Sequence, residues 1–250
     1  MRPLACATAA ALALSGIAAP AEAAEATTKT VYGYAWSDGQ GRLRITPKSA
    51  SFVKQKGFLG YRLKAAPRAK ELRLDYSRAA YGRITVACDL KETEGRVAVD
   101  RKGLGRTRCS PRDLSAELGR GPVPVRVEHR GGKATRVNEF VVADRPDQRS
   151  ARGTIKRIDD TTVVFASGGK KIKLGYTYAT SFYRTTAHCG SGWLTGRPVN
   201  ADANGLGKKP CTPAHLTKAL RTVRHPVLVK IEYTPGADSL DQVWEVFGDA

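Results

Sequence analysis

The sequence is poor in the residues from which catalytic centres are most often built. Only 4 of its 250 residues are histidine, and 23 acidic residues stand against 42 lysines and arginines. The motifs H-E-x-x-H, G-x-S-x-G and G-x-x-x-x-G-K-[ST] are all missing, which excludes the zinc-peptidase helix, the nucleophile elbow and the phosphate-binding loop. We therefore expect a protein that is not an enzyme and carries no cofactor.

Long apolar runs are missing too, except at the amino terminus. Residues 1–26 contain one early cation, Arg2, then an Ala/Leu-rich run and two A-x-A sites. This order is typical of a secretory signal peptide, cleaved after Ala23 or Ala26. Cys6 precedes the apolar run, so a lipidation site is not favoured. No other run approaches the roughly 18 apolar residues of a transmembrane helix, and we expect a secreted protein, extracellular or attached to the cell wall.

Acidic residues are scarce along the whole chain, and the formal net charge is +19. Such a charge favours attraction to polyanions such as wall polymers, nucleic acid, anionic lipid or acidic protein surfaces. The excess is uneven, because residues 27–146 carry 26 cations and 12 acids whereas residues 147–250 carry 15 and 9. The alternative explanation is that the charge serves only to keep the protein soluble.

What the sequence does contain is a long internal repeat. The stretch "GLGRTRCSPRDLSAEL", beginning at Gly103, returns as "GLGKKPCTPAHLTKAL", beginning at Gly205. Further on, "PVPVRVE" corresponds to "PVLVKIE", and before it "YGRITVAC" corresponds to "FYRTTAHC". Agreement over so many ordered blocks predicts a tandem duplication of one domain, joined in the polar linker at residues 144–150.

Each copy predicts the same order of elements. In the second copy, three strand-like stretches precede a long irregular segment, and a short helix then begins after Thr212 with Pro213 at its first position. Ser110 is the corresponding N-cap of the first copy. Two more strands follow, and five strands with one helix between the third and fourth is the order of an OB-type barrel. We expect a mainly β protein of two tandem OB-like five-stranded barrels, at residues 27–146 and 147–250.

The second copy also resembles a known kind of domain. Its stretches "GTIKRIDDTTVVFASGGKKIKLGYTYAT" and "HPVLVKIEY" are similar to small OB-like domains of secreted bacterial proteins whose function is unknown. The resemblance covers residues 151–248 and, through the repeat, residues 30–144. It implies a periplasmic or extracellular barrel that serves as a binding or structural module, and it supplies no catalytic residues. The long cysteine-bearing segment departs from the simplest form of such domains.

Apart from the cysteine in the leader, the sequence has one pair of cysteines in each copy, at equivalent positions. In an exported protein, paired cysteines are typical of disulfide bonds. Of the three possible pairings, the repeat selects Cys88–Cys109 and Cys189–Cys211. Each bridge is expected to tie the end of the third-strand region to the start of the helix.

A metal site is the alternative to the second bridge. A tetrahedral zinc ion would be held by His188, Cys189, Cys211 and His215. The first copy keeps both cysteines but has Ala87 and Asp113 at the two histidine positions. Cysteines that are kept without the histidines favour the bridge over the metal.

The two copies differ most between their second and third strands. Where the second copy has a two-glycine turn, the first inserts residues 47–70, with seven cations and no acid. Cations interleaved with aromatic residues suit polyanion backbones and stacking on bases or sugars, and they suit an anionic membrane surface as well. We expect the insertion to bind through Lys54, Lys56, Phe58, Tyr61, Arg62 and Lys64. Alternatively, it is a solvated loop whose aromatic side chains pack on the barrel.

Together these features predict a secreted, non-enzymatic binding protein whose partner is an anionic cell-wall polymer, nucleic acid or acidic protein. One alternative is a secreted hydrolase acting on a wall polymer, with its site in the Cys189–Cys211 segment and Ser191 as candidate nucleophile. Another is an inhibitor or protein-interaction module. Trp36, Trp193 and Trp244 could stack on sugars, although Trp244 alternates with valines in a strand and is expected in the core.

Overall fold

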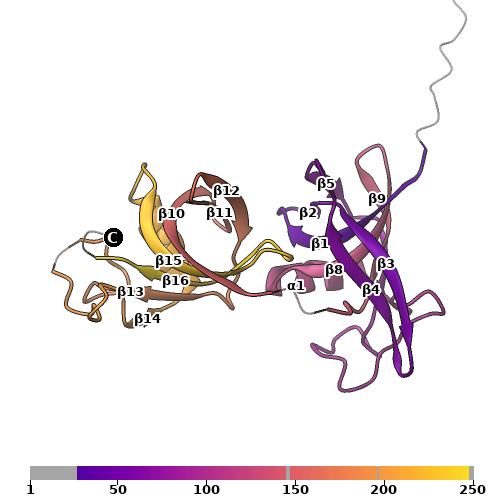
Figure 1. Ribbon diagram of the computed structural model, residues 1–250. Helices are drawn as coiled ribbons and strands as arrows, with labels where there is room; N and C mark the ends of the chain where they lie inside the picture. The colour runs from indigo at the N-terminus through magenta and orange to yellow at the C-terminus, as the bar shows by residue number, and fades with distance from the viewer. Residues whose placement is uncertain (1–26, 145–146, 196, 248–250) are drawn as a thin grey trace, which may run out of the picture.

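The computed structural model describes residues 27–144, 147–195 and 197–247, and Figure 1 shows them as two β-rich halves lying side by side. Strands make up 50% of the structure and helices 9%. The predicted signal peptide, residues 1–26, lies outside the described residues. Neither of the helices described has the length and apolar character that crossing a membrane requires.

The first half forms a nine-stranded sheet that contains a closed barrel. Its strands are β1 (Lys29–Ser37), β2 (Arg42–Ile45), β3 (Lys48–Gln55), β4 (Phe58–Ala65), β5 (Leu72–Asp75), β6 (Ala80–Arg83), β7 (Thr107–Cys109), β8 (Val123–Arg130) and β9 (Lys133–Glu139). Five of them, β1, β2, β5, β9 and β8, pair in a ring that one parallel pair, Asp75 with Lys133, closes. Alternate residues of β8 point inward, so one apolar core fills the barrel.

The second half forms a seven-stranded sheet with the corresponding pairings. Its strands are β10 (Arg149–Asp159), β11 (Thr162–Ser167), β12 (Lys170–Gly175), β13 (Ser181–Arg184), β14 (Lys209–Cys211), β15 (Val227–Thr234) and β16 (Ser239–Glu245). β12 meets β16 at one parallel pair, Gly175 with Ser239. This sheet is not a clear barrel, so the predicted five-stranded barrel is confirmed for the first half only.

Each half has one helix, and both helices begin where the sequence predicts them. The helix α1 (Pro111–Arg120) follows the N-cap Ser110, whose hydroxyl accepts a hydrogen bond from the backbone N–H of Asp113. The helix α2 (Pro213–Arg221) follows the N-cap Thr212. In each helix, two leucines four residues apart lie on one face and are buried in the core of their own half. They are Leu114, Leu118, Leu216 and Leu220.

The segment predicted to be irregular contains a pair of short strands in each half, β6 with β7 and β13 with β14. Strands of three or four residues are too short to show an alternating pattern, so the sequence does not reveal them. The repeated "GLG" forms a tight turn before β7 and β14, in which Asp100 and Asp202 accept backbone N–H groups. Gly103 and Gly205 have φ of 72° and 73°, a conformation that favours glycine.

Trp36 at the end of β1 joins the two halves. Its indole nitrogen donates a hydrogen bond to the carbonyl of Ala237, 3.0 Å away in the other half, and its side chain is 4% exposed. The ring lies directly on Gly175, where an added Cβ would come within 2.6 Å of it. The guanidinium of Arg44 lies 5.1 Å from the ring centroid. Close approach of the two halves therefore requires a glycine at position 175.

Polar contacts surround this indole. Lys173 of the second half donates to both carboxylate oxygens of Glu71 at 2.8 Å, and Lys48 of the first half lies 3.8 Å from Asp238. Burial between the halves raises the pKa of Asp238 above its usual range, although Lys48 and Arg44 favour the charged carboxylate. The contact between the halves thus combines one buried aromatic ring with partly buried ion pairs.

Replacing Trp36 by alanine tests this contact. We expect Trp36→Ala to lower the free energy of unfolding by about 3 to 5 kcal/mol, because it removes a large buried side chain and leaves a cavity. Urea denaturation followed by circular dichroism measures the change. The control is Val86→Ala, since Val86 is 51% exposed. A Trp36→Ala protein as stable as this control would show that the contact contributes little.

Candidate functional site

The four cysteines form the two predicted bridges. Cys88 is bonded to Cys109 and Cys189 to Cys211, with 5.6 Å between the Cα atoms of each pair. Each bridge links the segment after β6 or β13 to the last residue before the N-cap of a helix. The prediction from the repeat is confirmed, and such bonds are typical of proteins in oxidising compartments.

With both sulfur atoms joined in a disulfide, the second half does not form the alternative zinc site. The histidine His215 has another role, because its Nδ1 lies 2.7 Å from the hydroxyl of Thr212 at the start of α2. In the first half, the carboxylate of Asp113 caps α1 in the same way, accepting from the N–H of Ser110 at 2.8 Å. Histidine and aspartate at this position are therefore alternative caps. His188 is exposed beside the bridge.

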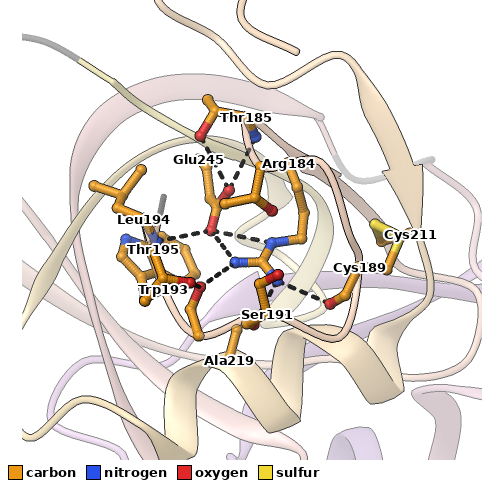
Figure 2. Close-up of polar contacts among 12 residues, drawn as sticks. Arg184, Thr185, Cys189, Ser191, Trp193, Leu194, Thr195, Cys211, Ala219 and Glu245 are labelled. Carbon is orange, nitrogen blue, oxygen red and sulfur yellow. Dashed lines mark hydrogen bonds and ion pairs between the residues drawn. A yellow bond between two sulfur atoms is a disulfide. The ribbon is translucent and has the colours of Figure 1, made fainter. Parts of the chain in front are cut away.

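A buried ion pair lies beside the second disulfide (Figure 2). Arg184 of β13 and Glu245 of β16 are both 0% exposed, and the guanidinium contacts one carboxylate oxygen at 3.1 and 2.6 Å. The same guanidinium donates to the carbonyls of Cys189 at 2.8 Å, Ser191 at 2.6 Å and Gly192 at 2.7 Å. One arginine therefore holds the loop after β13 against the last strand of the sheet.

The first half has a corresponding buried Arg–Glu pair, which lies in a more open environment. Arg83 contacts Glu139 at 3.5 Å and Glu117 of α1 at 3.1 Å, and it donates to the carbonyl of Cys88. Burial raises the pKa of Glu139, although hydrogen bonds from Tyr81 and from the backbone favour its charged form. A cavity of about 350 Å³ opens beside these residues.

In the second half, Trp193 lies beside the corresponding pair, as Figure 2 shows. Its ring stacks on Phe182 with 5.9 Å between the centroids, and it is buried. The described part of the Cys189–Cys211 segment therefore presents neither a free acid nor a free indole near Arg184. Within the described residues, the hydroxyl of Ser191 makes no hydrogen bond to either neighbouring histidine. The geometry gives no support to the hydrolase alternative.

The basic insertion is a β-hairpin rather than a loop. β3 and β4 pair along their whole length, from Lys48 with Ala65 to Gln55 with Phe58. Side chains alternate between the two faces of a hairpin, and paired residues share a face. The structure therefore separates the six candidate residues: Phe58, Arg62 and Lys64 lie on one face, Lys54 and Tyr61 on the other, and Lys56 in the turn.

Tyr61 is not available for stacking on a ligand. It is 7% exposed and packs against Tyr32 and Phe140, with ring centroids 5.1 and 5.0 Å apart. Its hydroxyl donates to the carbonyl of Lys102 at 2.8 Å, and burial raises its pKa to about 12. Arg62 forms an ion pair with Asp144 on the exposed face. Tyr61 is therefore structural, whereas Lys54, Lys56 and Lys64 remain exposed.

A second basic site was not predicted from the sequence. β6 lies between β7 and β9, and its outward residues, Ala80 and Gly82, pair with Arg136 and Arg108. These two arginines and Arg106 line a cavity of about 540 Å³, which we call the arginine groove. Among the residues that the structure describes, none of the three has an ion-pair partner. Over Gly82, the side-chain amide of Asn138 donates a hydrogen bond to the carbonyl of Gly105 at 3.0 Å and forms part of the groove floor.

The corresponding face of the second sheet is filled. Tyr183 and Trp244 stack there, with centroids 5.3 Å apart, and the ammonium of Lys230 lies 5.0 Å from the Trp244 ring. The prediction that Trp244 belongs to the core is wrong, since it is half-buried on the outer face and Val243 faces the core. Alternation alone does not tell which of two apolar sets points inward. The two halves therefore differ most at this face and at the hairpin.

No protein-family model, curated protein or solved structure matches this chain.

The buried ion pair of the second half gives a prediction about stability. We expect Glu245→Gln to lower the free energy of unfolding by about 3 to 5 kcal/mol, because Arg184 would remain buried without its counter-charge. Replacing both residues, with Arg184→Met and Glu245→Leu, should not restore stability, because three loop carbonyls would be left without a donor. Chemical denaturation measures both variants.

The matched control is the exposed pair of Arg62 and Asp144, whose side chains are about half exposed. Asp144→Asn should leave the free energy of unfolding nearly unchanged, because solvent screens this exposed pair. A double Arg184→Met and Glu245→Leu variant as stable as the parent would show that the loop carbonyls do not depend on the arginine.

Proposed function

We propose that this chain is a secreted, non-enzymatic protein that binds an anionic polymer outside the cell, through the arginine groove of its first half. The predicted leader, the two disulfides and the net charge of +19 support a basic exported protein. We also propose that the two halves are tandem copies of one OB-like domain. Their matching strand pairings, helices, disulfides and buried ion pairs support this.

The observation that carries the proposal is the arginine groove itself. Three arginines line it together with Ala80, Gly82 and Asn138, and no carboxylate in the described part of the chain pairs with them. The one carboxylate in the lining, that of Asp100, accepts hydrogen bonds from two backbone N–H groups. Unpaired arginines can offer forked pairs of hydrogen bonds to phosphate or carboxylate oxygens.

The surroundings of the groove favour a polymer over a small anion. The turn that follows Asp100 lies between the groove and the hairpin, since the carbonyl of Lys102 accepts the Tyr61 hydrogen bond and Gly103 contacts the backbone at Gly60. The exposed Arg101 and Lys102 side chains belong to this turn. Cations of this turn thus lie between the groove and the hairpin, and a chain with many charges binds more tightly with each additional cation that it reaches.

Neutralising the groove is the test of this proposal. The triple variant Arg106→Gln, Arg108→Gln and Arg136→Gln should bind poly(glycerol phosphate) and duplex DNA more weakly than the parent. For DNA, the slope of log affinity against log salt concentration should fall by roughly 0.9 for each phosphate that the variant no longer neutralises. Stability should change little, because substitutions of exposed charges usually change the free energy of unfolding by about 0.5 kcal/mol or less.

Two variants with the same loss of charge separate the groove from the hairpin and from net charge alone. One replaces Lys54, Lys56 and Lys64 of the hairpin by glutamine, and the other replaces Lys156, Lys170 and Lys171 of the second half. A smaller loss of affinity in both controls supports the groove. Equal losses of affinity in all three variants would show that binding depends only on net charge spread over the surface. The largest loss in the hairpin variant would place the binding site on the hairpin.

A further inference from the structure

The β3–β4 hairpin has one strand edge that no other strand covers. β3 pairs with β4 along its whole length, but it meets β1 at a single pair, Lys48 with Tyr32. Beyond that pair, no residue outside β4 in the described part of the chain forms a backbone hydrogen bond with β3. Figure 1 shows the long strands of the hairpin extending away from the barrel. An uncovered strand edge is a template for pairing with another chain.

The hydrogen bonds along the hairpin identify the residues of this edge. Gln55 and Phe58 flank a two-residue turn, so they exchange both backbone hydrogen bonds, and every second pair up the hairpin does the same. Phe52 and Tyr61 then form a pair whose backbone groups point away from each other. The contacts of Tyr61 agree, because its N–H and its carbonyl bond to residues 141–143 on the outer side of β4.

Ala50, Phe52 and Lys54 therefore direct their backbone N–H and C=O groups toward the free edge of β3. Their side chains share one face of the hairpin, where Phe52 is 45% exposed and Lys54 is exposed as well. A strand added at this edge would place one side chain against Phe52 and, two residues along, another against Lys54. An apolar residue suits the first position and a carboxylate suits the second.

The charge of the hairpin also favours an acidic strand. Residues 47–70 contain seven cations and no acid. Lys54 in β3 and Lys56 in the turn are exposed, and neither forms an ion pair with any described residue. Pairing of β3 with the same edge of a second copy would bring these like charges together, which opposes association between copies.

We propose that β3 binds an extended acidic segment of a partner protein, which adds a strand at the edge formed by Ala50, Phe52 and Lys54. Backbone hydrogen bonds hold the segment, and the side-chain contacts select an apolar residue two positions from an acid. This site is separate from the arginine groove, whose arginines belong to β9, to β7 and to the residue before β7.

The test uses an acetylated and amidated octapeptide of alternating valine and glutamate, with amide hydrogen exchange followed by NMR. In the free protein, the amide protons of Ala50, Phe52 and Lys54 should exchange faster than those of Ser51 and Val53, which bond to β4. The peptide should bind with a Kd of about 1 mM or tighter. At saturation it should slow exchange of the three edge amides roughly tenfold, because they become donors to the added strand.

Two control peptides separate strand pairing from charge attraction. One has all its backbone amides N-methylated, so it keeps the carboxylates but cannot donate to a strand edge. The other has lysine in place of each glutamate. Neither should protect the edge amides. Equal protection by either control peptide would overturn the proposal, as would fast exchange that the acidic peptide leaves unchanged.

Protein variants test the same edge from the other side. Ala50→Pro removes one edge N–H without removing a bond to β4, so it should weaken peptide binding roughly tenfold, whereas Ala50→Ser should not. The triple glutamine variant of the arginine groove should bind the peptide as the parent does, so failure of either proposal leaves the other standing. Slow exchange of the three edge amides in the free protein, or dimerisation through β3, would show that the edge is already covered and would also overturn the proposal.

Discussion

The structure of each half depends on one buried arginine that pairs with one buried glutamate. In the second half, Arg184 binds both Glu245 and the carbonyls of the loop after β13, so a single side chain joins the last strand, an internal strand and a long irregular segment. Arg83 and Glu139 do the same in the first half. A buried charge without its partner is costly, so strand order, loop path and disulfide position are fixed together.

Much of this architecture could be predicted from the sequence. The features that could not be predicted have physical reasons. The repeat and the N-cap residues predict the helices and the disulfides, because both signals are local. The buried arginines were missed, since a charged residue in a short strand is normally exposed. Yet Arg83 and Arg184 match within the repeat, as do Glu139 and Glu245, so the signal was present. The contact between the halves was not predictable, because it requires their relative placement.

The two halves keep the same framework but use the corresponding outer face differently. In the first half, Gly82 and Asn138 stand at the positions of Tyr183 and Trp244 in the second half, and three arginines line the cavity there. The hairpin of β3 and β4 adds a second small core around Tyr61, with no counterpart among the strands described in the second sheet. Because the buried ion pairs fix the frame, these surface positions can differ without changing strand order.

The packing of Trp36 on Gly175 also has a consequence for contacts between copies of the chain. It joins unlike surfaces, an indole on one half and a bare glycine on the other, and such head-to-tail contacts can in principle continue into a filament. In the repeat, however, Lys156 occupies the position that matches Trp36, and Asp75 occupies the position that matches Gly175. The second half thus has a lysine where the first has the indole, and the first half has an aspartate where the second has the glycine that contacts it. The same two positions therefore cannot make a second contact of this kind between copies of the chain.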